Sequence, residues 1–131
     1  MLPRVSHHDP GLPRPLSERE VAILDLMLGV DDPRLDALRE QSQAVRATWE
    51  CTCGCATINL GVDQSRARPA TGLCSPVTEA RHRATYDTDE FCELILFLQD
   101  GWLSSLELVW YANPIPEFPP VDDFEPATLC C

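Results

Sequence analysis

The sequence predicts an α+β fold in which two N-terminal helices pack on a four- to five-stranded antiparallel sheet. Apolar residues have helical spacing between Ser17 and Val45 and alternate with polar residues from Val45 onwards. A strong hairpin signal, Asp100-Gly101, separates the last two apolar segments. The 131 residues, 44% of them hydrophobic, suit a single modest core of ordinary globular composition.

Two helix starts are visible near the N-terminus. Ser17 and Glu20 fit a capping box, and Gly29 is placed to end that first helix. Asp32-Pro33 is a cap followed by proline at the first helical position, which predicts a second helix. The side chains expected to face the core are Val21, Ile23, Leu24, Met27, Leu28, Leu35 and Leu38.

A hairpin is predicted around Cys53-Gly54. With this pair as a two-residue loop, all flanking apolar residues fall on one sheet face, which we expect the helices to cover. The predicted pairs are Cys51 with Ala56, Trp49 with Ile58, Ala47 with Leu60, and Val45 with Val62.

Three further strands are expected after a loop over residues 63–76. Residues 77–86 have the weak apolar content of an edge strand, whereas residues 91–98 are apolar on both faces, as in a central strand. Residues 102–111 return as the hairpin partner of that central strand.

The ends of the chain differ from this middle part. Residues 1–16 are expected to be a flexible arm, 17–112 the single α+β domain, and 113–131 an extended, acidic, proline-rich tail. The N-terminus lacks the apolar region of a signal peptide, and no apolar run is long enough to span a bilayer. These features predict a cytoplasmic protein that does not contact membranes.

The charge distribution favours a basic partner. Of the net charge of −11, the last 48 residues contribute ten acidic side chains and no basic one. Such a field disfavours nucleic acid and would attract a basic protein, although solubility alone is an alternative explanation. Aromatic residues in the same stretch could anchor that partner. The candidate docking residues are Trp102, Trp110, Tyr111, Phe118, Asp122, Asp123 and Glu125.

The seven cysteines are an odd number, which is atypical of a secreted disulfide scaffold and predicts reduced thiols. Cys51-Thr52-Cys53-Gly54-Cys55 brings three thiols into one short segment, and thiolates are ligands of zinc. The one-residue spacing fits zinc knuckles poorly, and a fourth ligand would have to be Cys74, Cys92 or His82. Structural thiols and a redox pair are the alternatives.

Nothing in the sequence predicts an enzyme. Asp87, Asp89, Glu90 and Glu93 form an acidic cluster, but no base or nucleophile accompanies it, and a solvated strand entrance is the simpler interpretation. His82 is the one histidine outside the expected arm. No phosphate-binding loop, dinucleotide fingerprint, serine elbow or zinc-protease motif occurs.

Several segments together resemble a group of short, uncharacterised actinobacterial proteins. They are the helix start at residues 16–20, the segment 38–41, the cysteine segment followed by Ile58 and Leu60, the stretch 100–107, and the closing prolines. The resemblance implies no known activity. The small, acidic format is also similar in general type to bacterial immunity proteins.

Two function classes therefore stand side by side. The first is a small acidic, non-enzymatic interaction protein that needs no cofactor, such as an immunity-type inhibitor of a basic partner. The alternative is a small zinc-thiolate module that uses Cys51, Cys53, Cys55 and Cys74. The oligomeric state is left open by both.

Overall fold

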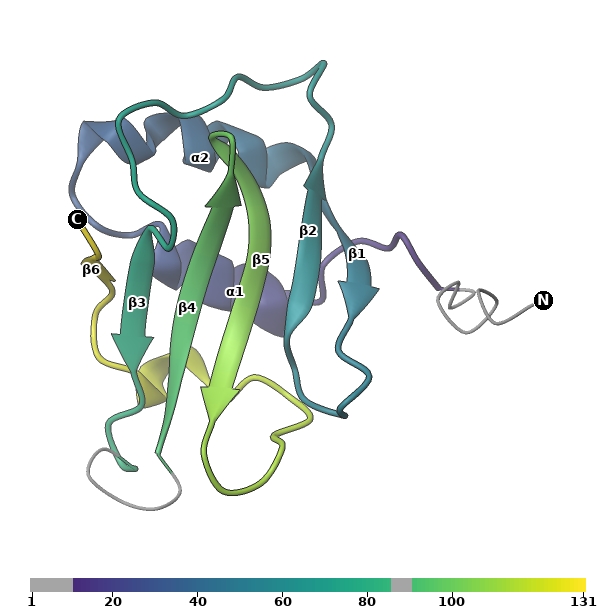
Figure 1. Ribbon diagram of the computed structural model, residues 1–131, viewed down its shortest axis with the longest axis vertical. Coiled ribbons are helices and arrows are strands. Elements are labelled where there is room, and N and C mark those ends of the chain that lie inside the picture. The colour runs from purple at the N-terminus through teal and green to yellow at the C-terminus, as the bar shows by residue number, and fades with distance from the viewer. Residues whose placement is uncertain (1–10, 86–90) are drawn as a thin grey trace.

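The computed structural model describes residues 11–85 and 91–131 and confirms the α+β class (Figure 1). Two α-helices, α1 (Glu18–Met27) and α2 (Asp36–Gln41), lie on one face of an antiparallel sheet. Three short 3-10 turns accompany them at Pro33–Leu35, Ser42–Ala44 and Val121–Asp123. The strands are β1 (Val45–Glu50), β2 (Ile58–Val62), β3 (Thr78–Arg81), β4 (Cys92–Gln99), β5 (Trp102–Trp110) and β6 (Thr128–Leu129).

The sheet has six strands in the order β1-β2-β5-β4-β3-β6, rather than the four to five expected. The additional strand, β6, comes from the proline-rich tail and pairs with β3, so β3 is not the edge strand that its weak apolar content suggested. β4 lies between β3 and β5, in the central position predicted for it. Asp100 and Gly101 both have positive φ and form the predicted turn between β4 and β5.

The start of α1 has the predicted capping box. Ser17 Oγ accepts from the Glu20 main-chain nitrogen at 3.1 Å, and Glu20 Oε1 accepts from the Ser17 nitrogen at 2.8 Å. Val21 was expected inside but is 45% exposed. It lies on the solvent side of the helix, because Ile23, Leu24 and Met27 already form the face that packs on the sheet.

The β1–β2 hairpin follows the predicted register in its first half and departs from it in the second. Val45 pairs with Val62 and Ala47 with Leu60, but a bulge at Thr48 then places Trp49 opposite Asn59. The prediction that Trp49 packs beside Ile58 under the helices is therefore wrong. Glu50, not Trp49, is the partner of Ile58. The predicted two-residue loop and the pair Cys51 with Ala56 are also wrong, because β1 ends at Glu50 and β2 begins only at Ile58.

One continuous core lies between the helices and the sheet. Its largest fully buried side chains come from both helices, the 3-10 turn before α2, three strands and the tail. They are Ile23, Leu24, Met27, Leu35, Leu38, Gln41, Ile58, Leu94, Leu96, Leu106, Leu108 and Phe124. Phe118 is also buried, so two tail phenylalanines belong to the core.

The segments at both ends of the predicted domain contact it. Arg14 forms a bridge with Ala47 of β1, and its guanidinium binds the carboxylates of Glu20 and Glu50. At the other end, the tail is tied to the loop before β3 by a disulfide between Cys74 and Cys131. Within residues 11–85 and 91–131, no helix has the length and apolar character needed to cross a membrane.

Candidate metal centre

The three cysteines of residues 51–55 lie in the loop at the tip of the β1–β2 hairpin, which we name the cysteine loop. The main-chain nitrogen of Cys51 donates to Thr57 O at 3.0 Å, which closes the loop at its base. Gly54 turns the chain with φ +93°, a conformation that residues with a Cβ rarely adopt. This turn lets the side chains of Cys53 and Cys55 approach each other.

The sulfur atoms of the loop converge. Cys51 Sγ lies 2.7 Å from Cys53 Sγ, which in turn lies 3.0 Å from Cys55 Sγ. All three sulfurs are within 4.8 Å of one another. Cys53 is exposed, and Cys51 and Cys55 are half-buried, so these thiols are not packed in the core as the structural alternative requires.

Hydrogen bonding within the loop shifts the pKa values of Cys53 and Cys55 in opposite directions. Bonding to Cys51 and Cys55 raises the pKa of Cys53 to about 11, so this thiol keeps its proton at neutral pH. For Cys55, burial opposes ionisation, but hydrogen bonds from Cys53 and Thr57 outweigh it and lower the pKa to about 7. Cys53 Sγ accordingly donates to Cys55 Sγ, which ionises at a lower pH than Cys53.

The fourth ligand suggested by the sequence is not part of this cluster. Cys74 is bonded to Cys131, so the expectation of seven reduced thiols is wrong for these two residues. Sequence spacing gave no signal for this bond, because it joins residues 57 positions apart. Of the other two candidates, Cys92 is buried in β4, and His82 stacks edge-on against Phe124 with ring centres 5.3 Å apart.

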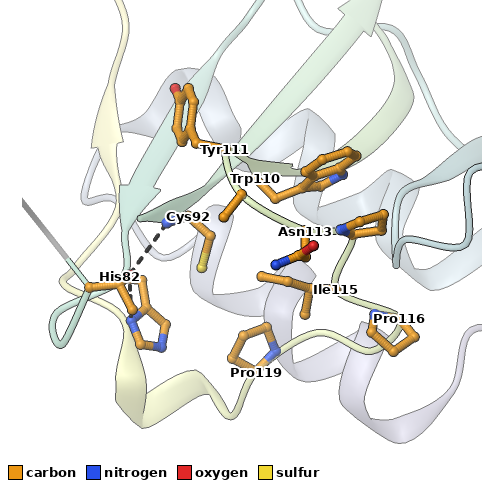
Figure 2. A pocket seen from close by; sticks show the side chains of 11 residues that line it. His82, Cys92, Trp110, Tyr111, Asn113, Ile115, Pro116 and Pro119 are labelled. Atoms are coloured by element: carbon orange, nitrogen blue, oxygen red, sulfur yellow. Dashed lines mark hydrogen bonds between the residues drawn. The ribbon is translucent and has the colours of Figure 1, made fainter. Parts of the chain in front are cut away.

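His82 and Cys92 instead line a second feature, a pocket of about 300 Å³ where β4 starts and β5 ends (Figure 2). It lies at the same end of the sheet as the cysteine loop, since its lining residue Ile115 accepts a hydrogen bond from the Ala56 nitrogen. The Thr85 hydroxyl accepts from the Cys92 main-chain nitrogen at 3.3 Å and lies 3.1 Å from His82 Nδ1. Burial raises the pKa of the Cys92 thiol, which makes it a weak nucleophile. The remaining lining is mostly apolar: Trp110, Tyr111, Ala112, Asn113, Pro114, Ile115, Pro116 and Pro119.

The candidate docking residues do not form one surface. Trp102 starts β5 and Trp110 ends it, so these two lie at opposite ends of the strand, and Phe118 is buried. Tyr111, Asp122, Asp123 and Glu125 are exposed. His82 Nε2, in the pocket wall, lies 3.9 Å from Asp123 Oδ2, which places that carboxylate beside the pocket.

Three residues of the predicted acidic cluster, Asp87, Asp89 and Glu90, fall outside the described residues. The fourth, Glu93, lies in β4 and accepts from the Tyr111 hydroxyl at 3.4 Å. The negative charge of Glu93 raises the pKa of Tyr111. This carboxylate therefore has an interaction of its own within the fold.

Sequence reasoning missed Thr57 as a member of the cysteine loop. Its hydroxyl accepts from the Leu108 main-chain nitrogen at 3.0 Å, which fixes the base of the loop to β5, and it also contacts Cys55. The residue lies beyond the cysteine segment, and threonine in a strand-rich region carries no specific signal.

Comparison with models of protein families, with curated proteins and with solved structures gives no match for this chain.

Proposed function

We propose that the chain is a small metal-thiolate protein that binds a thiophilic ion through Cys51, Cys53 and Cys55. The observation that carries the proposal is the convergence of three sulfurs within 4.8 Å in one loop. Thiolates at such spacing are ligands for zinc and other soft metals. The position of the loop at a hairpin tip leaves it open to an arriving ion, since Cys53 is exposed.

The supporting geometry lies within a single loop. Apart from its two chain neighbours, nothing lies within 4 Å of where a Cβ on Gly54 would be, so the tip of the loop is not packed against the rest of the fold. With metal–sulfur bonds of about 2.3 Å at tetrahedral angles, the sulfurs would lie about 3.8 Å apart. Binding therefore requires the two short separations to widen by about 1 Å.

Titration with cadmium tests this proposal, because cadmium–thiolate bonds absorb in the ultraviolet and report sulfur ligation directly. We expect one ion per chain for the unmodified protein and none for the Cys51→Ser, Cys53→Ser, Cys55→Ser triple variant. A matched variant with Cys92→Ser and Cys130→Ser, the two free thiols outside the loop, should bind normally. Equal binding by both variants would exclude the loop as the site.

A second candidate is docking of a basic partner at the end of the molecule that carries the pocket. The specific observation is Tyr111, which is 60% exposed beside this pocket, with Asp123 on another side of it. An exposed aromatic ring next to carboxylates suits an arginine-rich segment, because arginine both stacks and pairs with acids. This candidate keeps the interaction-protein class, including the immunity type, and assigns no catalytic step.

An NMR titration with an arginine-rich peptide tests the docking candidate. Amide shifts should concentrate at Trp110, Tyr111, Asp122 and Asp123, and should weaken as salt increases, because exposed charges are screened beyond about 8 Å at physiological ionic strength. Replacing Asp122, Asp123 and Glu125 with lysine reverses their charges and should remove these amide shifts. Shifts spread evenly over all acidic residues would contradict a defined docking surface.

A further inference from the structure

The number of ligands in the cysteine loop bears on which ion it would hold. The potential ligand atoms are the sulfurs of Cys51, Cys53 and Cys55. Within residues 11–85 and 91–131, no histidine, carboxylate or further cysteine joins this group. Cys74, the cysteine that could have completed the set, is bonded to Cys131. A structural zinc site is almost always closed by four protein ligands in a tetrahedron.

The neighbouring polar groups are engaged in holding the loop in place. The Thr57 hydroxyl accepts from the Leu108 nitrogen, and the Ala56 nitrogen donates to Ile115 O at 2.8 Å. The Cys51 nitrogen is used at the base of the loop. These groups therefore anchor the loop between β5 and the tail.

Three sulfurs are enough to surround a three-coordinate ion. An ion in the plane of three sulfurs, with bonds of about 2.3 Å, spaces them by about 4.0 Å. The three sulfurs lie within 4.8 Å of one another, and the separations of 2.7 and 3.0 Å would widen by about 1 Å to reach this spacing. The half-buried Cys51 and Cys55 and the exposed Cys53 leave one side of that centre facing solvent.

We infer that Cys51, Cys53 and Cys55 form a three-coordinate, all-sulfur site for a copper(I) ion. This inference rests on the proposed function and goes beyond it by naming the ion. Soft thiolate ligands suit both copper(I) and zinc, so the number of ligands decides between them. Three sulfurs satisfy the monovalent copper(I) ion, whereas zinc would need a further ligand from solvent. Each Cu–S bond replaces an S–H bond or takes up an existing thiolate, the displaced protons pass to solvent, and no electron is transferred.

The test supplies copper(I) as its acetonitrile complex, under argon, to the full chain with its disulfide intact. Bicinchoninate competes for copper(I), and 4-(2-pyridylazo)resorcinol competes for zinc in a parallel titration. We expect the protein to withdraw one copper(I) per chain from excess bicinchoninate but to lose zinc to the resorcinol dye. X-ray absorption of the copper complex should give three sulfur neighbours.

Single variants assign the ligands. Cys51→Ser, Cys53→Ser and Cys55→Ser should each weaken copper(I) binding at least 100-fold, whereas Cys130→Ser and Thr52→Ala should leave it unchanged. Thr52 lies in the same loop and is exposed, so its substitution tests the loop without removing a sulfur. Far-ultraviolet circular dichroism of each variant checks that the fold is retained.

The outcomes separate this inference from the proposed function. Two sulfur neighbours around copper, together with one serine variant that keeps full copper(I) affinity, would overturn the three-coordinate site. Metal binding by the loop would still stand. Zinc held against the resorcinol dye and not displaced by copper(I) would overturn the choice of ion in the same way. Failure to bind copper(I), zinc or cadmium would overturn the proposed function itself.

Discussion

Gln41 Oε1 accepts a hydrogen bond of 2.8 Å from the main-chain nitrogen of Leu103, which lies 62 residues later in the chain. Its Nε2 donates to Arg68 O and Gly101 O, each at 2.9 Å. Gln41 is fully buried, and its amide is satisfied at both ends. This one side chain therefore fixes the end of α2 to the β4–β5 turn and to the loop that crosses above it.

Replacing Gln41 with leucine should destabilise the protein by about 2 kcal/mol, because the buried Leu103 N–H would lose its acceptor. Urea unfolding followed by tryptophan fluorescence measures the change. Gln43→Leu is the matched control, since Gln43 is exposed in the neighbouring 3-10 turn. Equal stability of the two variants would show that the Gln41 hydrogen bonds contribute nothing net.

Gly101→Ala should be more damaging than Gly54→Ala, although both glycines have positive φ. A Cβ at Gly101 would collide with the carbonyl oxygen of Ala70, whereas one at Gly54 meets nothing within 4 Å. We expect a loss of about 1 kcal/mol at Gly54 from backbone strain alone and about 2 kcal/mol more at Gly101. Similar unfolding midpoints for the two variants would contradict this difference.

The hairpin register shows how far sequence reasoning reached. Period-two alternation correctly gave the pairs Val45 with Val62 and Ala47 with Leu60. Alternation failed at Trp49 because Thr48 forms a bulge. The bulge requires a small residue across from it, since a Cβ on Gly61 would lie only 2.6 Å from the Thr48 methyl group. A single glycine in a strand is compatible with a bulge but does not identify its partner.

The candidate site was likewise predictable from the sequence only in part. The convergence of Cys51, Cys53 and Cys55 follows from their closeness in sequence and from Gly54, so the cluster could be suggested in advance. The disulfide and β6 depend on where a tail with five prolines returns to the fold. Such a return is set by burial of Phe118 and Phe124, which is a tertiary effect without local periodicity.

The stability of the protein should depend on Glu20 below about pH 4.5. Burial alone would raise the pKa of Glu20, but hydrogen bonds from Arg14 and from the Ser17 main chain outweigh it, and the pKa is lowered from 4.5. A lowered folded-state pKa contributes stability that is present above the unfolded value and is lost as the pH falls through the folded one. Unfolding free energy should therefore decrease as the pH falls below about 4.5.

Glu20→Gln should remove this part of the acid sensitivity and cost about 2 kcal/mol at neutral pH, where the charged hydrogen bonds to Arg14 are formed. Glu18→Gln, an exposed residue of the same helical turn, should retain the acid dependence of the unmodified chain. Urea denaturation at a series of pH values measures both. Parallel curves for the two variants would rule out Glu20 as the group responsible.

The disulfide between Cys74 and Cys131 should be the main covalent constraint on the tail. It joins residues 57 positions apart, and the loss of chain entropy for a loop of this length corresponds to about 4 kcal/mol of stability. Cys131→Ser should lower the unfolding free energy by about that amount and expose the tail residues around β6 to proteolysis. Cys130→Ser removes an exposed free thiol one position away and should have little effect.

A thiol titration in denaturant provides an independent check, because the unreduced protein should show five reactive thiols, those of Cys51, Cys53, Cys55, Cys92 and Cys130. Seven thiols before reduction, or equal stability of the two serine variants, would contradict the bond and its role in holding the tail.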